Sequence, residues 1–131
     1  MSDQYTLKQV EILGGVLEYI YIPGKKDLPT LVMLHEGLGS ISTWKEFPKQ
    51  VSNTIHNPIL LYSRHGYGSS SFIKQRFCSS YMHDEALKVL PALISRLKLN
   101  RVILYGHSDG ASIAAIFCLL YTSPSPRDTI R

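Results

Sequence analysis

A serine stands between two glycines where an apolar run gives way to a helical pattern. Residues 101–105 read RVILY, as expected of a strand buried on both faces, and residues 110–117 have the small and apolar composition of a helix. The segment GHSDG, residues 106–110, joins them. Such a tight turn forces its central residue into strained backbone geometry. The pattern therefore predicts that the Ser108 hydroxyl projects above the end of a sheet.

The surroundings expected of Ser108 suit a nucleophile. The helix that follows presents free backbone N–H groups and the positive end of its dipole, and the Asp109 amide could donate to a developing oxyanion. Gly106 and Gly110 remove the Cβ atoms that would clash in the turn. The alternative is an ordinary turn between strand and helix, in which Ser108 only caps the helix.

A second glycine-containing loop follows another apolar run. Residues 30–35 read TLVMLH and lead into HEGLGS, residues 35–40. Gly37 and Gly39 let the backbone turn across the end of the sheet and point an amide at the same reacting carbonyl. We predict that the Gly37 amide is the second oxyanion donor. The alternative is a glycine-rich loop with no catalytic part.

The order of the remaining patterns predicts an α/β fold. Glycines at 14 and 15 suggest a hairpin, further apolar runs suggest buried strands, and periodic segments suggest helices, one with a kink at Pro91. Strands that alternate with helices imply a mostly parallel sheet with helices on both faces. The expected strands are 7–13, 16–22, 30–35, 58–62 and 101–105, and the expected helices are 41–55, 81–97 and 110–117.

Three motifs in this order carry a family resemblance. HEGLGS followed by Trp44, then YSRHGYGSS at residues 62–70, then GHSDG resemble the H-G-x-x-G-S…W loop, the D-R-x-G-x-G-x-S loop and the nucleophile elbow of α/β-hydrolase-fold proteins. The resemblance covers about residues 8–117, the N-terminal half of that fold. Two positions depart from the pattern: Glu36 replaces a glycine, and Ser63 stands where aspartate is frequent.

The resemblance implies a serine hydrolase. Members that are epoxide hydrolases or haloalkane dehalogenases use aspartate where this chain has Ser108, so esterase, thioesterase, lactonase or C–C hydrolase chemistry remains. The fold places its residues in the order serine, acid, histidine. After Ser108 the sequence has no histidine, and its acids are Asp109 and Asp128. The 131-residue chain is therefore expected to lack the base and its orienting acid, and to be inactive.

The end of the chain suggests a reason for this absence. Residues 118–128, CLLYTSPSPRD, resemble the translation of a sequencing adapter. We expect residues 1–117 to be the N-terminal part of a single α/β-hydrolase domain, truncated after the helix that follows the elbow, and residues 118–131 to be an artefactual tail. A genuine Ser/Pro-rich tail is the alternative.

The charge and cysteine content indicate which classes of binding partner to expect. The 14 Lys and Arg against 10 Asp and Glu give +4, but no basic run exceeds Lys25-Lys26, so neither nucleic acid nor a membrane is an expected partner. Two cysteines form no disulfide framework and no metal-ligand spacing, which favours a cytoplasmic protein without a metal. We expect a small acyl substrate, an acyl-enzyme and no cofactor. The alternatives are a non-catalytic relative that binds a small ligand, and a domain whose two loops hold an anion.

Overall fold

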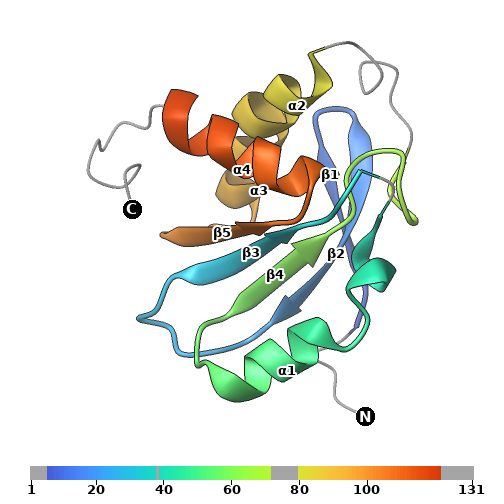
Figure 1. Ribbon diagram of the computed structural model, residues 1–131. Coiled ribbons are helices and arrows are strands. Elements are labelled where there is room, and N and C mark those ends of the chain that lie inside the picture. Colours follow the sequence, from blue (N-terminus) through green and yellow to red (C-terminus); the bar gives the residue numbers. More distant parts are fainter. Residues whose placement is uncertain (1–5, 38, 72–79, 122–131) are drawn as a thin grey trace.

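The continuous apolar runs form the parallel strands of a five-stranded sheet. The computed structural model describes residues 6–37, 39–71 and 80–121. Within these residues the strand order is β1-β2-β4-β3-β5. β3 pairs in parallel with β4 and β5, whereas β2 pairs antiparallel with β1 and β4 (Figure 1). The strands are β1 (Lys8–Ile12), β2 (Gly15–Ile22), β3 (Thr30–Leu34), β4 (Ile59–Tyr62) and β5 (Val102–Gly106).

The β1–β2 hairpin turns one residue earlier than expected. Ile12 pairs with Gly15, so Leu13 and Gly14 form the turn, with φ of 51° and 85°. Positive φ at both central residues matches the right-handed twist of a hairpin. Gly15 belongs to β2, where a Cβ atom would lie 2.8 Å from the His65 ring.

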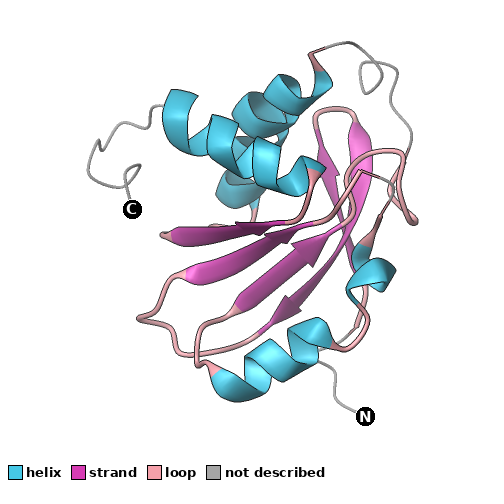
Figure 2. Ribbon diagram, in the orientation of Figure 1, coloured by secondary structure: helices cyan, strands magenta, loops and turns pink. Residues whose placement is uncertain are grey.

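The helices cover both faces of the sheet, as the strand and helix order predicted. Figure 2 shows helices on either side of the strands, and Figure 1 places α2, α3 and α4 together on the face opposite α1. No helix in the described part of the chain is both long enough and apolar enough to cross a membrane. The helical segments are η2 (Ile41–Trp44, a 3-10 turn), α1 (Phe47–Thr54), α2 (Tyr81–Asp84), η4 (Glu85–Val89, a π-helical stretch), α3 (Leu90–Arg96) and α4 (Asp109–Leu120).

Two expected helices differ in detail. The segment 41–55 is interrupted because Lys45 has φ of 54°, and Pro48 then fits the first turn of α1. In segment 81–97 the π-helical stretch lies directly before the turn that holds Pro91, whose nitrogen cannot donate a hydrogen bond. The helix continues through Pro91 to Arg96.

The last helix passes the expected boundary at residue 117. α4 continues to Leu120, so residues 118–120 are helical. Residues 122–131 lie outside the described residues. The division into a domain and a tail stays a prediction.

Each face of the sheet has its own apolar cluster. One cluster joins strand residues such as Leu34 and Leu60 to helical residues. These are Leu90 and Leu93 of α3 and Ile113 of α4. The opposite cluster consists of Ile22, Met33, Ile59 and Leu61, with Trp44 and Val51 packed against it. Alternate residues of β3 and β4 thus face opposite helical layers, which explains why these strands are apolar throughout.

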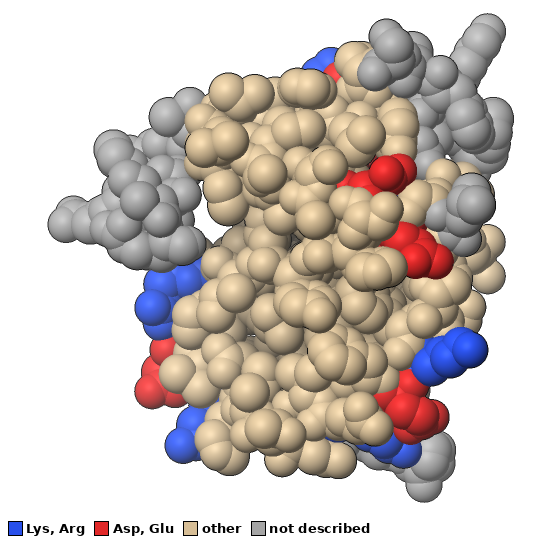
Figure 3. All heavy atoms as spheres, in the orientation of Figure 1, with Lys and Arg blue, Asp and Glu red and all other residues tan. Residues whose placement is uncertain are grey.

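β5 is one of the two edge strands among the described residues, and β1 is the other. The β5 side chains Ile103 and Tyr105 are 46% and 45% exposed, so the prediction that this strand is buried on both faces was wrong. On the face drawn in Figure 3, the Lys and Arg side chains lie apart from one another around the rim and form no broad basic patch.

A buried tyrosine at the end of β4 is expected to make the stability of the fold depend on pH. The Tyr62 hydroxyl donates to Glu85 Oε2 at 2.7 Å, and both residues are buried. Burial and the adjacent Glu85 carboxylate raise the pKa of Tyr62 well above its ordinary value, against the opposing charge of Arg64. The unfolded chain loses this proton near pH 10, whereas the folded chain keeps it. Stability from Tyr62 is therefore complete below about pH 10 and falls as the pH rises toward the folded-state pKa.

We expect Tyr62→Phe to lower the free energy of unfolding by about 1–2 kcal/mol near neutral pH, because Glu85 loses a buried donor. The variant should also lose the part of the alkaline decline that Tyr62 causes. Urea unfolding of both proteins between pH 7 and 11 measures each effect. Tyr21→Phe, at an exposed tyrosine of β2, is the control. Equal alkaline slopes for wild type and Tyr62→Phe would contradict the assignment.

Candidate functional site

The connection between β5 and α4 is a strained elbow centred on Ser108. Ser108 has φ of 58° and ψ of −117°, is exposed, and directly precedes the first residue of α4. A non-glycine residue in this region is rare and occurs preferentially at functional sites. The His107 amide donates to Leu34 O at 3.1 Å and the Gly110 amide to His107 O at 3.0 Å. These bonds fix the elbow above the end of β3.

Close backbone approach explains both elbow glycines. A Cβ atom at Gly106 would lie 2.3 Å from the backbone of Gly110, and one at Gly110 would lie 2.0 Å from Leu34 O. No real Cβ atom sits this close to a backbone atom. The two glycines thus let α4 begin directly against β5 and β3, as the sequence predicted.

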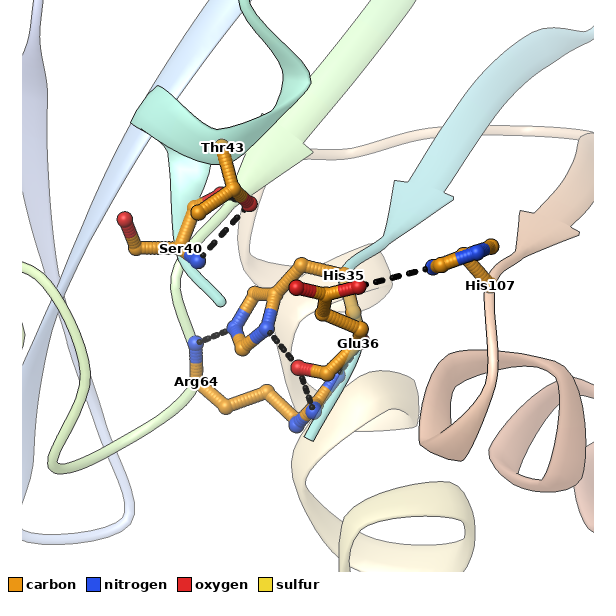
Figure 4. A network of polar contacts seen from close by, with 6 residues as sticks. All are labelled: His35, Glu36, Ser40, Thr43, Arg64 and His107. Atoms are coloured by element: carbon orange, nitrogen blue, oxygen red, sulfur yellow. Dashed lines mark hydrogen bonds and ion pairs between the residues drawn. The ribbon is translucent and has the colours of Figure 1, made fainter. Parts of the chain in front are cut away.

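The loop after β3 begins with a buried histidine whose tautomer is set by its neighbours. The Arg64 amide donates to His35 Nε2 at 3.0 Å, so Nδ1 carries the proton and donates to Glu36 O at 2.7 Å. The Arg64 guanidinium also donates to His35 O and Glu36 O, at 2.6 and 3.0 Å. Figure 4 shows these bonds between the two loops. His35 is therefore neutral and structural.

The loop that contains Gly37 approaches the side chain of Asp109 at the start of α4. A Cβ atom at Gly37 would lie 2.6 Å from Asp109 Oδ2, so the loop after β3 contacts the start of α4. The Asp109 carboxylate also accepts a hydrogen bond from the Tyr81 hydroxyl. A Cβ atom at Gly39 would instead meet Thr43 Oγ1 at 2.8 Å and Glu36 Cγ at 3.0 Å. Gly39 thus shapes the turn into η2, and Leu38 lies outside the described residues.

A carboxylate and an imidazole meet beside the elbow, which the sequence did not predict. Glu36 Oε1 and His107 Nδ1 are 3.1 Å apart, and the dashed line in Figure 4 joins them across the two loops. A cavity of about 220 Å³ is lined by this pair together with Thr43 and Trp44. Glu36 directly precedes Gly37, and His107 directly precedes Ser108. The one available signal was the replacement of the usual glycine by Glu36.

The described residues do not complete a catalytic triad. Within residues 6–37, 39–71 and 80–121, no histidine or carboxylate is hydrogen bonded to the Ser108 hydroxyl, and His107 is directed to Glu36. The same residues contain no group of three or more His, Cys, Asp or Glu side chains that could hold a metal ion. The roles predicted for Ser108 and for the amides of Asp109 and Gly37 therefore stay predictions.

Comparison with known proteins identifies the fold family. The family model described as alpha/beta hydrolase fold matches residues 29–127. The chain belongs to the α/β hydrolase family. The match includes both loops and the elbow, in agreement with the resemblance in the sequence.

The curated relatives of this α/β hydrolase are longer proteins. A proline iminopeptidase of Lactobacillus crispatus is 32% identical over 108 residues, and one of Lactobacillus helveticus is 28% identical over 113 residues. These alignments cover 82% and 86% of the chain but 36% and 38% of the relatives. The chain therefore spans little more than a third of their length.

Solved structures confirm the α/β hydrolase fold. An epoxide hydrolase from Vigna radiata superposes with a TM-score of 0.74 at 22% identity, over 90% of this chain and 36% of that one. A haloalkane dehalogenase from Bradyrhizobium elkani superposes with a TM-score of 0.69 at 25% identity, over 83% and 35% of the two chains. The parallel core strands and their helices thus occupy the positions expected for the N-terminal part of this fold.

Proposed function

We propose that the complete protein is a serine hydrolase acting on a small carboxylic ester, thioester, lactone or related acyl substrate. The single observation that carries this proposal is the exposed Ser108 at a strained elbow, with α4 beginning at the next residue. A serine held in this way projects from the sheet toward a substrate and lies beside the helix N-terminus.

The chemistry follows from the residues around Ser108. Its Oγ attacks the substrate carbonyl carbon while a histidine takes the hydroxyl proton. The amides of Asp109 and Gly37 stabilise the oxyanion. When the intermediate collapses, the bond to the leaving group breaks, the histidine delivers the proton to that group, and an acyl-enzyme remains. Water then attacks this acyl-enzyme by the same route. The histidine and its orienting acid would follow Ser108 in the complete protein.

The cavity beside the elbow supports a small substrate. Its 220 Å³ corresponds to about seven waters at roughly 30 Å³ each. Glu36 and His107 make one wall polar, while Trp44 makes another aromatic. The names of the curated relatives add a peptide that carries proline as a candidate substrate. The serine at the elbow favours acyl transfer over the epoxide and haloalkane reactions named for the structural neighbours.

The test begins with the native sequence that follows the codon for Phe117, read independently from the source DNA. The protein from the complete reading frame is then treated with a fluorophosphonate probe and assayed with p-nitrophenyl acetate, an acyl thioester, a lactone and proline p-nitroanilide. We expect covalent labelling at Ser108 and turnover of at least one acyl substrate. The 131-residue chain, which lacks a histidine after Ser108, should remain unlabelled.

A complete protein that is folded but neither labelled nor active would contradict the proposal. Protection by inorganic phosphate against thermal unfolding would then favour an anion-binding domain. Protection by an uncharged small ligand would favour a non-catalytic relative.

A further inference from the structure

Two consecutive residues hold the loop after β3 at both of its ends. At the start of the loop, Arg64 bonds to His35 Nε2 through its amide and to two carbonyl oxygens through its guanidinium. At the end of the loop, the Ile41 amide donates to Ser63 Oγ at 2.9 Å. The described residues of this loop, 35–37 and 39–41, are thus held by Arg64 at the start and by Ser63 at the end. We call residues 35–37 and 39–41 the oxyanion loop.

The orientation of the Ser63 hydroxyl depends on a buried carboxylate. Ser63 Oγ donates to Glu18 Oε2 at 2.6 Å, and Ser63 is fully buried while Glu18 is 6% exposed. A hydroxyl has one proton. Because that proton goes to Glu18, the lone pairs of Ser63 remain directed at the Ile41 amide.

The surroundings of Glu18 form a shaped slot for its side chain. Gly68 has φ of 54°, and a Cβ atom there would lie 2.1 Å from Glu18 Oε2. Ser70 Oγ accepts from the Glu18 amide at 2.9 Å and donates to Ser63 O at 2.6 Å. The backbones also meet, since the Ser63 amide donates to Glu18 O at 3.2 Å. The loop after β4 therefore wraps around this carboxylate.

A buried carboxylate is costly unless it makes compensating bonds. The buried Glu18 carboxylate accepts a hydrogen bond from Ser63, and Ser63 in turn accepts one from Ile41 of the oxyanion loop. The bond that compensates the burial of Glu18 therefore also orients the serine that holds the loop. We propose that Glu18 is a positioning residue: acting through Ser63, it fixes the end of the oxyanion loop and with it the Gly37 amide. This inference rests on the proposed function for its effect on turnover, but not for its effect on the Ile41 hydrogen bond.

The test compares variants of the complete protein. Glu18→Ala and Ser63→Ala should each lower kcat about tenfold, with KM within twofold, because small displacements of catalytic groups slow the chemical step. Fluorophosphonate labelling of Ser108 should slow to the same degree. Exchange of the Ile41 amide proton, followed by NMR, should accelerate at least tenfold. Glu11→Gln, at an exposed acid on the neighbouring strand β1, is the matched control and should change none of these quantities.

A re-paired variant separates positioning from a general packing role. Ser63→Asp places a second carboxyl group in the slot beside Glu18, where the two acids repel each other. Adding Glu18→Gln supplies an amide donor to the new acid, whose other oxygen can accept from Ile41. The double variant E18Q/S63D should therefore recover kcat to within about threefold of wild type, whereas S63D alone should not.

Two results would overturn the inference. One is wild-type kcat and wild-type Ile41 exchange in Glu18→Ala. The other is a lower melting temperature in Glu18→Ala without any change in kcat of the folded enzyme. If the wild-type protein is neither labelled nor active, the proposed function fails, and Ile41 exchange alone then decides whether Glu18 positions the loop.

Discussion

Replacing Ser108 with alanine is expected to reduce kcat/KM of the complete protein by about 10⁴-fold or more, because the acyl-enzyme can no longer form. Labelling by the fluorophosphonate probe should disappear. The alanine variant should keep the wild-type circular dichroism spectrum, since the Ser108 side chain makes no capping hydrogen bond to α4. Steady-state kinetics and mass spectrometry of the labelled protein measure these outcomes.

The control for Ser108→Ala is Ser112→Ala, one helical turn further along α4. Ser112 is also exposed, so it tests whether any accessible serine of this helix reacts with the probe. Its kcat/KM should stay within about twofold of wild type, as for most surface changes. Retained labelling and turnover in Ser108→Ala would show that the nucleophile lies elsewhere.

Replacing Gly110 with alanine is expected to lower the free energy of unfolding by about 3 kcal/mol. The new methyl group would lie 2.0 Å from Leu34 O, a backbone atom that cannot move without disturbing β3 and its pairing with β4 and β5. Activity of the complete protein should fall as well, because Asp109 is adjacent to the displaced residue. Urea unfolding measures the change in stability.

The matched control is Gly14→Ala in the β1–β2 turn. A Cβ atom at Gly14 meets no atom within 4 Å, but φ is 85° there, so only backbone strain of about 1–2 kcal/mol applies. Equal losses for the two variants would contradict the steric explanation of Gly110. A smaller loss of stability for Gly14→Ala than for Gly110→Ala would show that steric overlap with Leu34 O, and not backbone strain alone, destabilises the Gly110 variant.

Local sequence patterns predicted the sheet to within about a residue per strand. The buried strands β3 and β4 are short apolar runs because both faces of the sheet are covered there, and this leaves a direct signal in the sequence. The break at Lys45 left no such signal, since a lysine with positive φ is set by tertiary packing and not by its own preference. The π-helical stretch was predicted only as a kink near Pro91.

The sequence indicated those parts of the candidate site whose residues lie next to one another in the chain. Ser108 with Gly106 and Gly110 forms a local motif, and the contact between Gly37 and Asp109 follows because parallel strands end at the same edge. The Glu36–His107 contact and the Glu18–Ser63 bond join residues far apart in the sequence. Neither pair has a periodicity or spacing of its own, so only the folded chain reveals them.

The strand order has a consequence for how the chain folds as it is synthesised. β4 lies between β2 and β3, although β3 comes earlier in the chain. When β3 leaves the ribosome, the β1–β2 hairpin can already form, but the position next to it is empty and β3 has no partner strand. At typical rates of synthesis β3 waits on the order of seconds until β4 arrives. The apolar residues 31–34 of β3 are therefore without their partner strands β4 and β5 during this interval.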